Sequence, residues 1–150
     1  MYTCSLLLGL QMLIENAIAP VWYHDYGQAV GEARAAGKPL AVFISHGGNG
    51  PGNHSTEGKL GPEVRRVLAE FYVCLYLDGA RPGHRELIVA FEGGESPLLV
   101  LSDRSITYQA LHHAGKIDNT QLAQVLKECQ AREEVAAAPP EEPSTVQCRT

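Results

Sequence analysis

The sequence predicts a single α/β domain built on a mixed β-sheet with helices on both faces. Two short, uninterrupted apolar runs, Leu40–Ile44 and Tyr72–Leu77, are typical of strands buried on both faces. An amphipathic segment that follows Pro62 lies between them, and a strand, helix, strand order of this kind forms a right-handed crossover. With 150 residues, of which 45% are apolar, the chain is long enough for one compact domain.

The first predicted helix precedes the first strand and carries signals at both ends. Asp25 is placed to cap its N-terminus, with Gln28 three residues later, and Gly37 before Pro39 ends it. One face of the helix is apolar, formed by Tyr26, Ala29, Val30 and Ala33. We therefore expect this face to pack on the sheet.

Three further helices are predicted along the chain. The first begins at Pro62, and its apolar residues have helical spacing: Val64, Val67, Leu68 and Phe71. A short helix is predicted over His84–Phe91, closed by two glycines. A final helix begins after Asp118, with an apolar stripe formed by Leu122, Val125, Leu126 and Cys129.

Two more strands are predicted over Pro97–Leu101 and Ile106–Ala110. The turn between them is short, which makes this pair antiparallel. We expect right-handed crossovers to join the first three strands in parallel, and the last strand to be an antiparallel edge. The result is a mixed sheet of about four core strands covered by helices on both faces.

The two ends of the chain differ from its middle, so we divide it into residues 1–21, 22–131 and 132–150. Ser5–Ile14 has the length of a signal-peptide core and Ala17–Ala19 resembles a cleavage site, but no Lys or Arg precedes the core. This segment is an export signal, an extra helix on a cytoplasmic protein, or sequence that precedes a true start at Met12. Its apolar core is too short to span a bilayer. Residues 132–150 are rich in Pro, Glu and Ala, which predicts a disordered tail.

Charge and cysteine content exclude two classes of function. The net charge is -5 and the basic residues are scattered, so we expect no nucleic-acid partner. The four cysteines are far apart and form no C-x-x-C motif, which argues against a disulfide scaffold and a zinc site. Cys74 and Cys129 fall in apolar patterns, which predicts that both are buried and inert.

Several motifs occur at particular places in this order of elements. They are KPLAVFIS (38–45), YVCLYLD (72–78), ESPLLVLSD (95–103) and HHAGK (112–116), preceded by the aromatic pair Trp22 and Tyr26. From Trp22 to Gln130 their order and spacing resemble the thioredoxin-like superfamily. The resemblance implies that Pro97 follows a cis peptide bond and that Gly115 is the glycine after the last strand.

The resemblance stops at the redox motif. Thioredoxins reduce disulfides with a C-x-x-C at the start of the helix after the first core strand, where the helix dipole lowers the pKa of the attacking thiol. The corresponding region, Ser45–Gly61, contains no cysteine. Disulfide exchange requires an accessible thiolate and a resolving thiol. We therefore expect no dithiol–disulfide oxidoreductase activity and no cofactor.

The glycine-rich segment 45–61 leaves other chemistries open. Its residues Gly52–Leu60 approach a P-loop but miss its spacing and its magnesium-binding hydroxyl. His46 and His54 suggest a metal site, although surface histidines in polar loops are commoner than ligands. Ser45 or Ser55 with a histidine would suggest a hydrolase, but no nucleophile-elbow motif is present. A non-redox enzyme or metal-binding protein that uses this segment is thus the alternative.

The function predicted first is binding of a protein or an extended peptide. In thioredoxin-like domains the residues before the cis-proline offer backbone groups to an extended peptide, which is a form of strand addition. The resemblance places such a groove between the glycine-rich segment and the strand at Pro97. Its predicted residues are His46, Gly47, Gly48, Asn49, Ser96 and Pro97.

Overall fold

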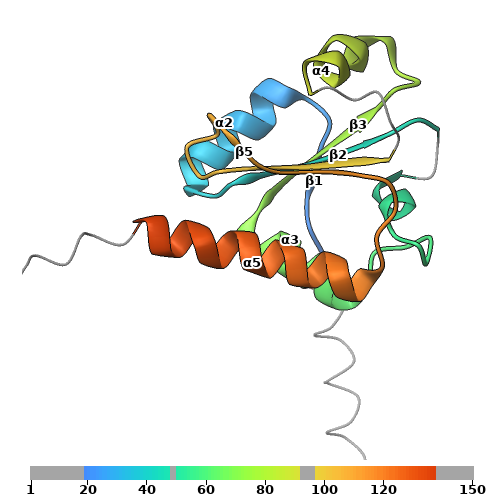
Figure 1. Cartoon of the computed structure of the whole chain (residues 1–150). Helices are drawn as coiled ribbons and strands as arrows, with labels where there is room; N and C mark the ends of the chain where they lie inside the picture. The colour runs from blue at the N-terminus through green and yellow to red at the C-terminus, as the bar shows by residue number, and fades with distance from the viewer. Residues whose placement is uncertain (1–18, 48–49, 92–96, 138–150) are drawn as a thin grey trace, which may run out of the picture.

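The computed structural model describes residues 19–47, 50–91 and 97–137 (Figure 1). The strands are β1 (Trp22–Tyr23), β2 (Leu40–Ser45), β3 (Val73–Asp78), β4 (Leu98–Ser102) and β5 (Gln109–Ala114). The helices are α2 (Tyr26–Ala36), α3 (Pro62–Phe71), α4 (Arg85–Ala90) and α5 (Asn119–Ala137), with short 3-10 helices η1 (Gly50–His54) and η2 (Pro82–His84). The strands form one mixed sheet in the order β1-β3-β2-β4-β5.

Helices cover both faces of this sheet, as predicted. Phe43 and Cys74 point to the face covered by α3 and α5, where they pack with side chains such as Val67. The alternate residues of β2, including Val42, point to the face covered by α2 and α4 and pack with Ala29 and others. β2 and β3 are buried on both faces, which agrees with their sequences being apolar up to the last residue of each strand, Ser45 and Asp78. The predicted α/β fold class is confirmed.

The ends of α2 form as the sequence indicates. The Asp25 carboxylate accepts a hydrogen bond of 2.8 Å from the backbone N–H of Gln28. Gly37 adopts φ 64°, the left-handed conformation that ends a helix and that glycine adopts without strain.

The direction of β4 corrects the prediction of three parallel strands. β2 and β3 are parallel, but β4 pairs with β2 in the antiparallel direction. In its described part, the connection from β3 to β4 contains the 3-10 helix η2 and the short helix α4, which is about 9 Å long. It lies at the carboxyl end of β3 (Figure 1) and is too short to span the length of the sheet, about 20 Å for a six-residue strand. The chain therefore re-enters the sheet from the end at which it left.

The last strand also differs from the prediction. It covers Gln109–Ala114 rather than Ile106–Ala110, because a turn organised by Asp103 takes up the preceding residues. The Asp103 carboxylate accepts hydrogen bonds of 3.1 Å from the backbone N–H groups of Thr107 and Tyr108. Such carboxylate bonds hold the backbone in a turn and prevent it from extending as a strand.

Further differences concern the two ends of the domain. Trp22 and Tyr23 form a short parallel strand beside β3 that the sequence analysis did not predict. At the other end, α5 continues to Ala137, so residues 132–137, which we assigned to a disordered tail, are helical. Within the described ranges, no helix combines the length and apolar character needed to cross a membrane. Most of the predicted N-terminal segment 1–21 and residues 138–150 lie outside the described residues.

Candidate functional site

The segment between β2 and α3 packs against the body of the domain in the part that the structure describes. It contains η1, and Ser55 forms an isolated parallel bridge with Ile117, just before α5. The Ile117 N–H donates to the His54 carbonyl at 2.9 Å, and the Thr56 N–H donates to the Ile117 carbonyl at 3.1 Å. Residues 50–58 are thus attached to a distant part of the chain. Part of this glycine-rich segment has regular structure, the 3-10 helix η1.

His54 lies at the centre of this attachment. Its side chain is 1% exposed and meets the Phe43 ring edge-on, with ring centroids 4.8 Å apart. Its Nδ1 lies 3.1 Å from the Pro51 carbonyl oxygen, and its Nε2 lies 3.0 Å from the Leu98 carbonyl oxygen. The ring therefore links η1 to β4 through the residue that follows Pro97. The sequence analysis treated His54 as a surface histidine or a metal ligand, and neither describes a buried ring between two carbonyl groups.

The two carbonyl partners of His54 favour a protonated ring, whereas burial of the ring favours the neutral form. A carbonyl oxygen only accepts hydrogen bonds, and a neutral imidazole has one N–H to donate. The protonated ring would satisfy both carbonyls, but burial disfavours its charge. Burial is the larger effect and lowers the pKa of His54, although the carbonyls of Leu98 and Pro51 act to raise it. Near neutral pH, His54 is therefore uncharged, and one of its ring nitrogens donates a hydrogen bond to a carbonyl oxygen.

Asp78 fixes the start of the same segment at the end of β3. Its carboxylate accepts hydrogen bonds from the N–H groups of Ala80 at 2.9 Å and Gly47 at 3.4 Å, which lower the pKa of the carboxyl group. The His46 ring lies against Gly79, where an added Cβ would be 2.1 Å from its Cδ2 atom. Only glycine at position 79 leaves room for the ring of His46.

The structure places half of the predicted groove residues. His46 and Gly47 lie against the end of β3, and Pro97 accepts a hydrogen bond of 2.8 Å at its carbonyl from the Gly115 N–H. Gly48, Asn49 and Ser96 lie outside the described residues. The peptide bond before Pro97 involves Ser96, so its cis form stays a prediction.

An open recess that the sequence analysis did not predict borders the outer side of η1. It has a volume of about 430 Å³ and is lined by Trp22, Pro51, Gly52, Gly58, Lys59, Leu60 and Arg65. The backbone chains cross closely there, since a Cβ on Gly52 would lie 2.9 Å from the Gly58 carbonyl oxygen. The recess thus combines an indole ring, two cationic side chains and glycine backbone, and its described lining contains no carboxylate.

The thiol and hydroxyl groups of the described core are not placed for nucleophilic chemistry. Cys74 and Cys129 are buried free thiols, and burial raises the pKa of Cys74 to about 12. Ser45 is fully buried and shares a hydrogen bond of 2.6 Å with the Tyr76 hydroxyl. Ser55 is fully buried and accepts a hydrogen bond from the Glu57 N–H at 3.1 Å. These groups are therefore closed to a substrate.

Metal ligands do not gather at the segment either. Among the described residues, no group of three or more His, Cys, Asp and Glu side chains is arranged to hold a metal ion.

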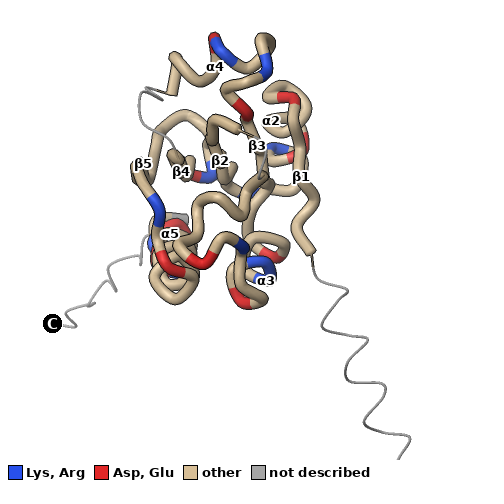
Figure 2. The backbone as a smooth tube through the Cα atoms, turned by 90° about the vertical axis from the view of Figure 1, so that its right-hand side faces the viewer, with Lys and Arg blue, Asp and Glu red and all other residues tan. Residues whose placement is uncertain are grey.

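The charged residues of both signs are distributed along the backbone (Figure 2). On α3, for example, Arg66 lies 3.9 Å from Glu63 and 3.8 Å from Glu70.

Comparison with solved structures identifies the fold. A thioredoxin from Thermus thermophilus superposes with a TM-score of 0.66 at 16% sequence identity, over 84% of this chain and 98% of that chain. The chain has the thioredoxin-like fold. A DsbH oxidoreductase superposes with a TM-score of 0.60 at 14% identity, over 75% of this chain and 85% of that one. A thioredoxin variant from Halobacterium salinarum gives a TM-score of 0.50 at 14% identity, over 75% of this chain and 91% of that chain.

These likenesses extend to architecture alone, because the sequence matches no known family profile and no curated protein. In this thioredoxin-like domain, the segment between β2 and α3 occupies the position at which the sequence resemblance predicts a redox motif. That segment contains no cysteine. Its described part instead carries a buried histidine on its inner side and an open recess on its outer side.

Proposed function

We propose that this thioredoxin-like domain binds a segment of another protein and performs no disulfide exchange. The observation that carries the proposal is the segment that precedes α3, which lacks cysteine and borders the Trp22 recess. Its packing against Leu98 and Ile117 gives the recess a preformed wall. A preformed wall lowers the entropy cost of binding a flexible peptide.

The recess favours an acidic, extended peptide with apolar side chains. Lys59 and Arg65 supply two positive charges beside the indole ring of Trp22, which packs edge-on to Phe43 at a centroid distance of 5.1 Å. Aromatic and arginine side chains are enriched at the centres of protein interfaces. The volume of about 430 Å³ accommodates more than one side chain.

The residues predicted from the sequence form a second proposed contact, of which the structure describes His46, Gly47 and Pro97. The predicted set is His46, Gly47, Gly48, Asn49, Ser96 and Pro97. The His54 bond to the Leu98 carbonyl holds η1 beside the strand that follows Pro97. An extended peptide would pair its backbone with these residues, while the recess would select its side chains.

The single tryptophan makes the recess directly measurable. Trp22 is the only tryptophan in the chain, so its fluorescence reports on its own surroundings. We expect a saturable change on titration with an octapeptide of alternating glutamate and leucine. A peptide of alternating lysine and leucine should bind much more weakly, and added salt should weaken the binding of the acidic peptide.

Two adjacent arginines provide a matched pair of variants. Arg65 lines the recess, whereas Arg66 is paired with Glu63 and Glu70 on the same helix. Arg65→Gln should weaken binding of the acidic peptide by about fivefold, and Arg66→Gln should leave it unchanged. Equal effects of the two substitutions, or equal binding of the acidic and basic peptides, would contradict the proposed site.

The absence of redox activity is tested separately. We expect no reduction of insulin disulfides by the full chain with dithiothreitol as electron donor, above the rate of dithiothreitol alone. Turnover that disappears in a Cys74→Ser variant would overturn this part of the proposal. It would leave the result of the peptide titration unaffected.

A further inference from the structure

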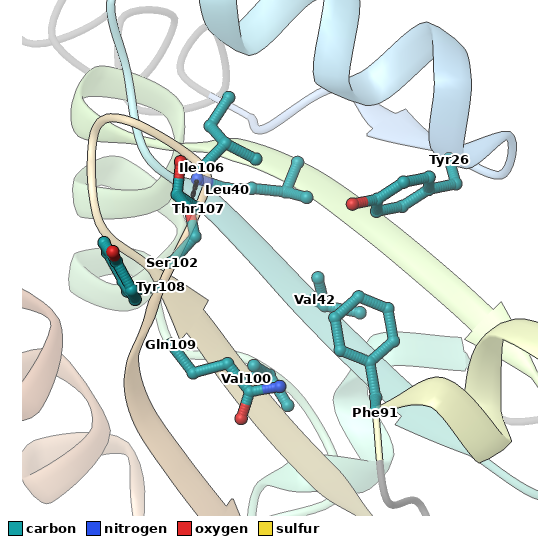
Figure 3. A pocket seen from close by; sticks show the side chains of 10 residues that line it. All are labelled: Tyr26, Leu40, Val42, Phe91, Val100, Ser102, Ile106, Thr107, Tyr108 and Gln109. Carbon is teal, nitrogen blue, oxygen red and sulfur yellow. Dashed lines mark hydrogen bonds between the residues drawn. The ribbon is translucent and has the colours of Figure 1, made fainter.

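A second pocket, drawn in Figure 3, lies on the face of the sheet that α2 and α4 cover, whereas Trp22 of the recess packs on the other face. It has a volume of about 130 Å³ and lies between α2, the residue after α4 and the turn that connects β4 to β5. Its floor consists of Leu40, Val42 and Val100, three branched side chains from the buried face of β2 and β4. This pocket shares no lining residue with the Trp22 recess.

Two aromatic rings form one wall of the pocket. Tyr26 from α2 and Phe91 from the end of α4 lie edge to face, with centroids 6.1 Å apart. In Figure 3 both rings stand beside the floor residue Val42. Such a pair offers its ring edges and faces to a further aromatic group, a contact that aromatic groups favour.

Polar groups reach the same space from two directions. The Tyr26 hydroxyl and the Gln109 carboxamide both point towards the pocket in Figure 3, and neither makes a side-chain hydrogen bond within the described ranges. Ser102 differs, because its hydroxyl already accepts from the Leu40 N–H and donates to the Asp103 carbonyl, each at 2.8 Å. Two hydrogen-bonding groups are thus free to bind a ligand.

The backbone at the pocket edge is strained. Ile106 has φ 59°, a left-handed conformation that is unfavourable for a β-branched residue. The bonds from Asp103 to the Thr107 and Tyr108 N–H groups hold the turn in this shape. The strained conformation directs the Ile106 side chain to the pocket and the apolar core. Strain of this type concentrates at ligand sites and other functional positions.

We propose that this pocket binds a small, neutral phenol. Its ring would lie on the floor beside Tyr26 and Phe91, and its hydroxyl would bond to the Tyr26 hydroxyl or the Gln109 carboxamide. The volume of about 130 Å³ is close to, and slightly below, that of a cavity of about 150 Å³ that accommodates benzene, so one ring would fill the pocket and its substituents would lie at the open edge. None of the ten described lining residues is charged, which excludes recognition of an ionised ligand there. Both polar groups can donate to or accept from a hydroxyl.

The test compares p-cresol with toluene, which has the same ring and methyl group but no hydroxyl. The full chain, labelled with ¹⁵N, is titrated with each compound and followed by amide chemical shifts. We expect p-cresol to give saturable shifts at Tyr26, Phe91 and residues 107–109, with an affinity about fivefold above that of toluene. Equal affinities, or shifts that increase linearly without saturation, would overturn the proposal.

Two variants and a third probe locate and define the site. Gln109→Leu should reduce the affinity for p-cresol, and Ile106→Gly should weaken both compounds while it relieves the backbone strain. Gln121→Leu on the exposed side of α5 is the control and should change neither affinity. Unchanged p-cresol binding in both pocket variants would refute this location. If N-acetyltyrosinamide binds more tightly than p-cresol, the ligand of this pocket is the tyrosine side chain of a protein and not a free phenol.

Discussion

Replacement of His54 by alanine removes the side chain that links η1 to β4. The imidazole is buried against Phe43 and lies within hydrogen-bond distance of the carbonyl oxygens of Pro51 and Leu98. Truncation of a large buried side chain leaves a cavity, and it leaves at least one carbonyl without its donor. Together these effects should lower the free energy of unfolding by about 3–4 kcal/mol. For a domain of this size the thermal midpoint should fall by about 10 °C.

The same substitution should remove one component of the pH dependence of stability. The pKa of His54 is lowered from its ordinary value of 6.5 in the folded protein. As the pH falls below 6.5, the unfolded chain therefore takes up a proton at this position before the folded protein does. The unfolded state then binds more protons, so the His54 contribution to stability is complete above pH 6.5 and decreases below it. His54→Ala lacks the imidazole, so its unfolding free energy should not contain this decrease at low pH.

Urea unfolding followed by circular dichroism, from pH 7.5 to pH 5, measures both effects. The difference in unfolding free energy between the wild type and His54→Ala should be largest at pH 7.5 and should shrink towards pH 5. His113→Ala, on the edge strand β5, is the control and should cost much less. A loss below about 1 kcal/mol for His54→Ala, or a difference that does not change with pH, would refute the role assigned to the buried ring.

Three further substitutions or reactions test other parts of the structure. Gly79→Ala should destabilise the domain by less than about 1 kcal/mol in urea unfolding, because the new Cβ would displace the exposed His46 ring to another rotamer; a loss above about 2 kcal/mol would show that the ring cannot move. Tyr72→Phe should cost about 1–2 kcal/mol in the same measurement, because the buried hydroxyl donates to the Leu126 carbonyl at 2.7 Å, and a neutral result would contradict this bond. Cys74 should resist iodoacetamide at pH 8 until denaturant is added, since its thiol is buried with a pKa raised to about 12; rapid labelling of the native protein, detected by mass spectrometry, would contradict that burial.

The elements that the sequence predicted well are those with local signals. β2 and β3 are continuous apolar runs, and the capping residue Asp25 and the closing Gly37 mark α2 on both sides. The direction of β4 carries no such signal, because it depends on the length and position of the connection from β3 to β4. The end of α5 was placed too early because its last turns are polar, and a helix on the surface needs no apolar residue there.

The candidate site shows the same limit. The absence of cysteine between Ser45 and Gly61 is visible in the sequence. The burial of His54 is not, because its neighbours in the sequence are polar and glycine-rich, and contacts with distant residues such as Phe43, Leu98 and Ile117 enclose it. Trp22 and the cationic residues of the recess are separated along the chain, and the pairing of β1 with β3 brings them together.

Because β1 has only two residues, little free energy is needed to detach it and open the recess. Two residues, Trp22 and Tyr23, pair with β3, and the indole ring is further held by its contact with Phe43. Short terminal strands open at a much lower free energy than the core of a domain. A ligand that contacts Trp22 would therefore close this strand as it binds, and anything that pulls the strand away would release the ligand. Ligand binding in the recess and pairing of β1 with β3 would therefore be thermodynamically coupled, so that each favours the other.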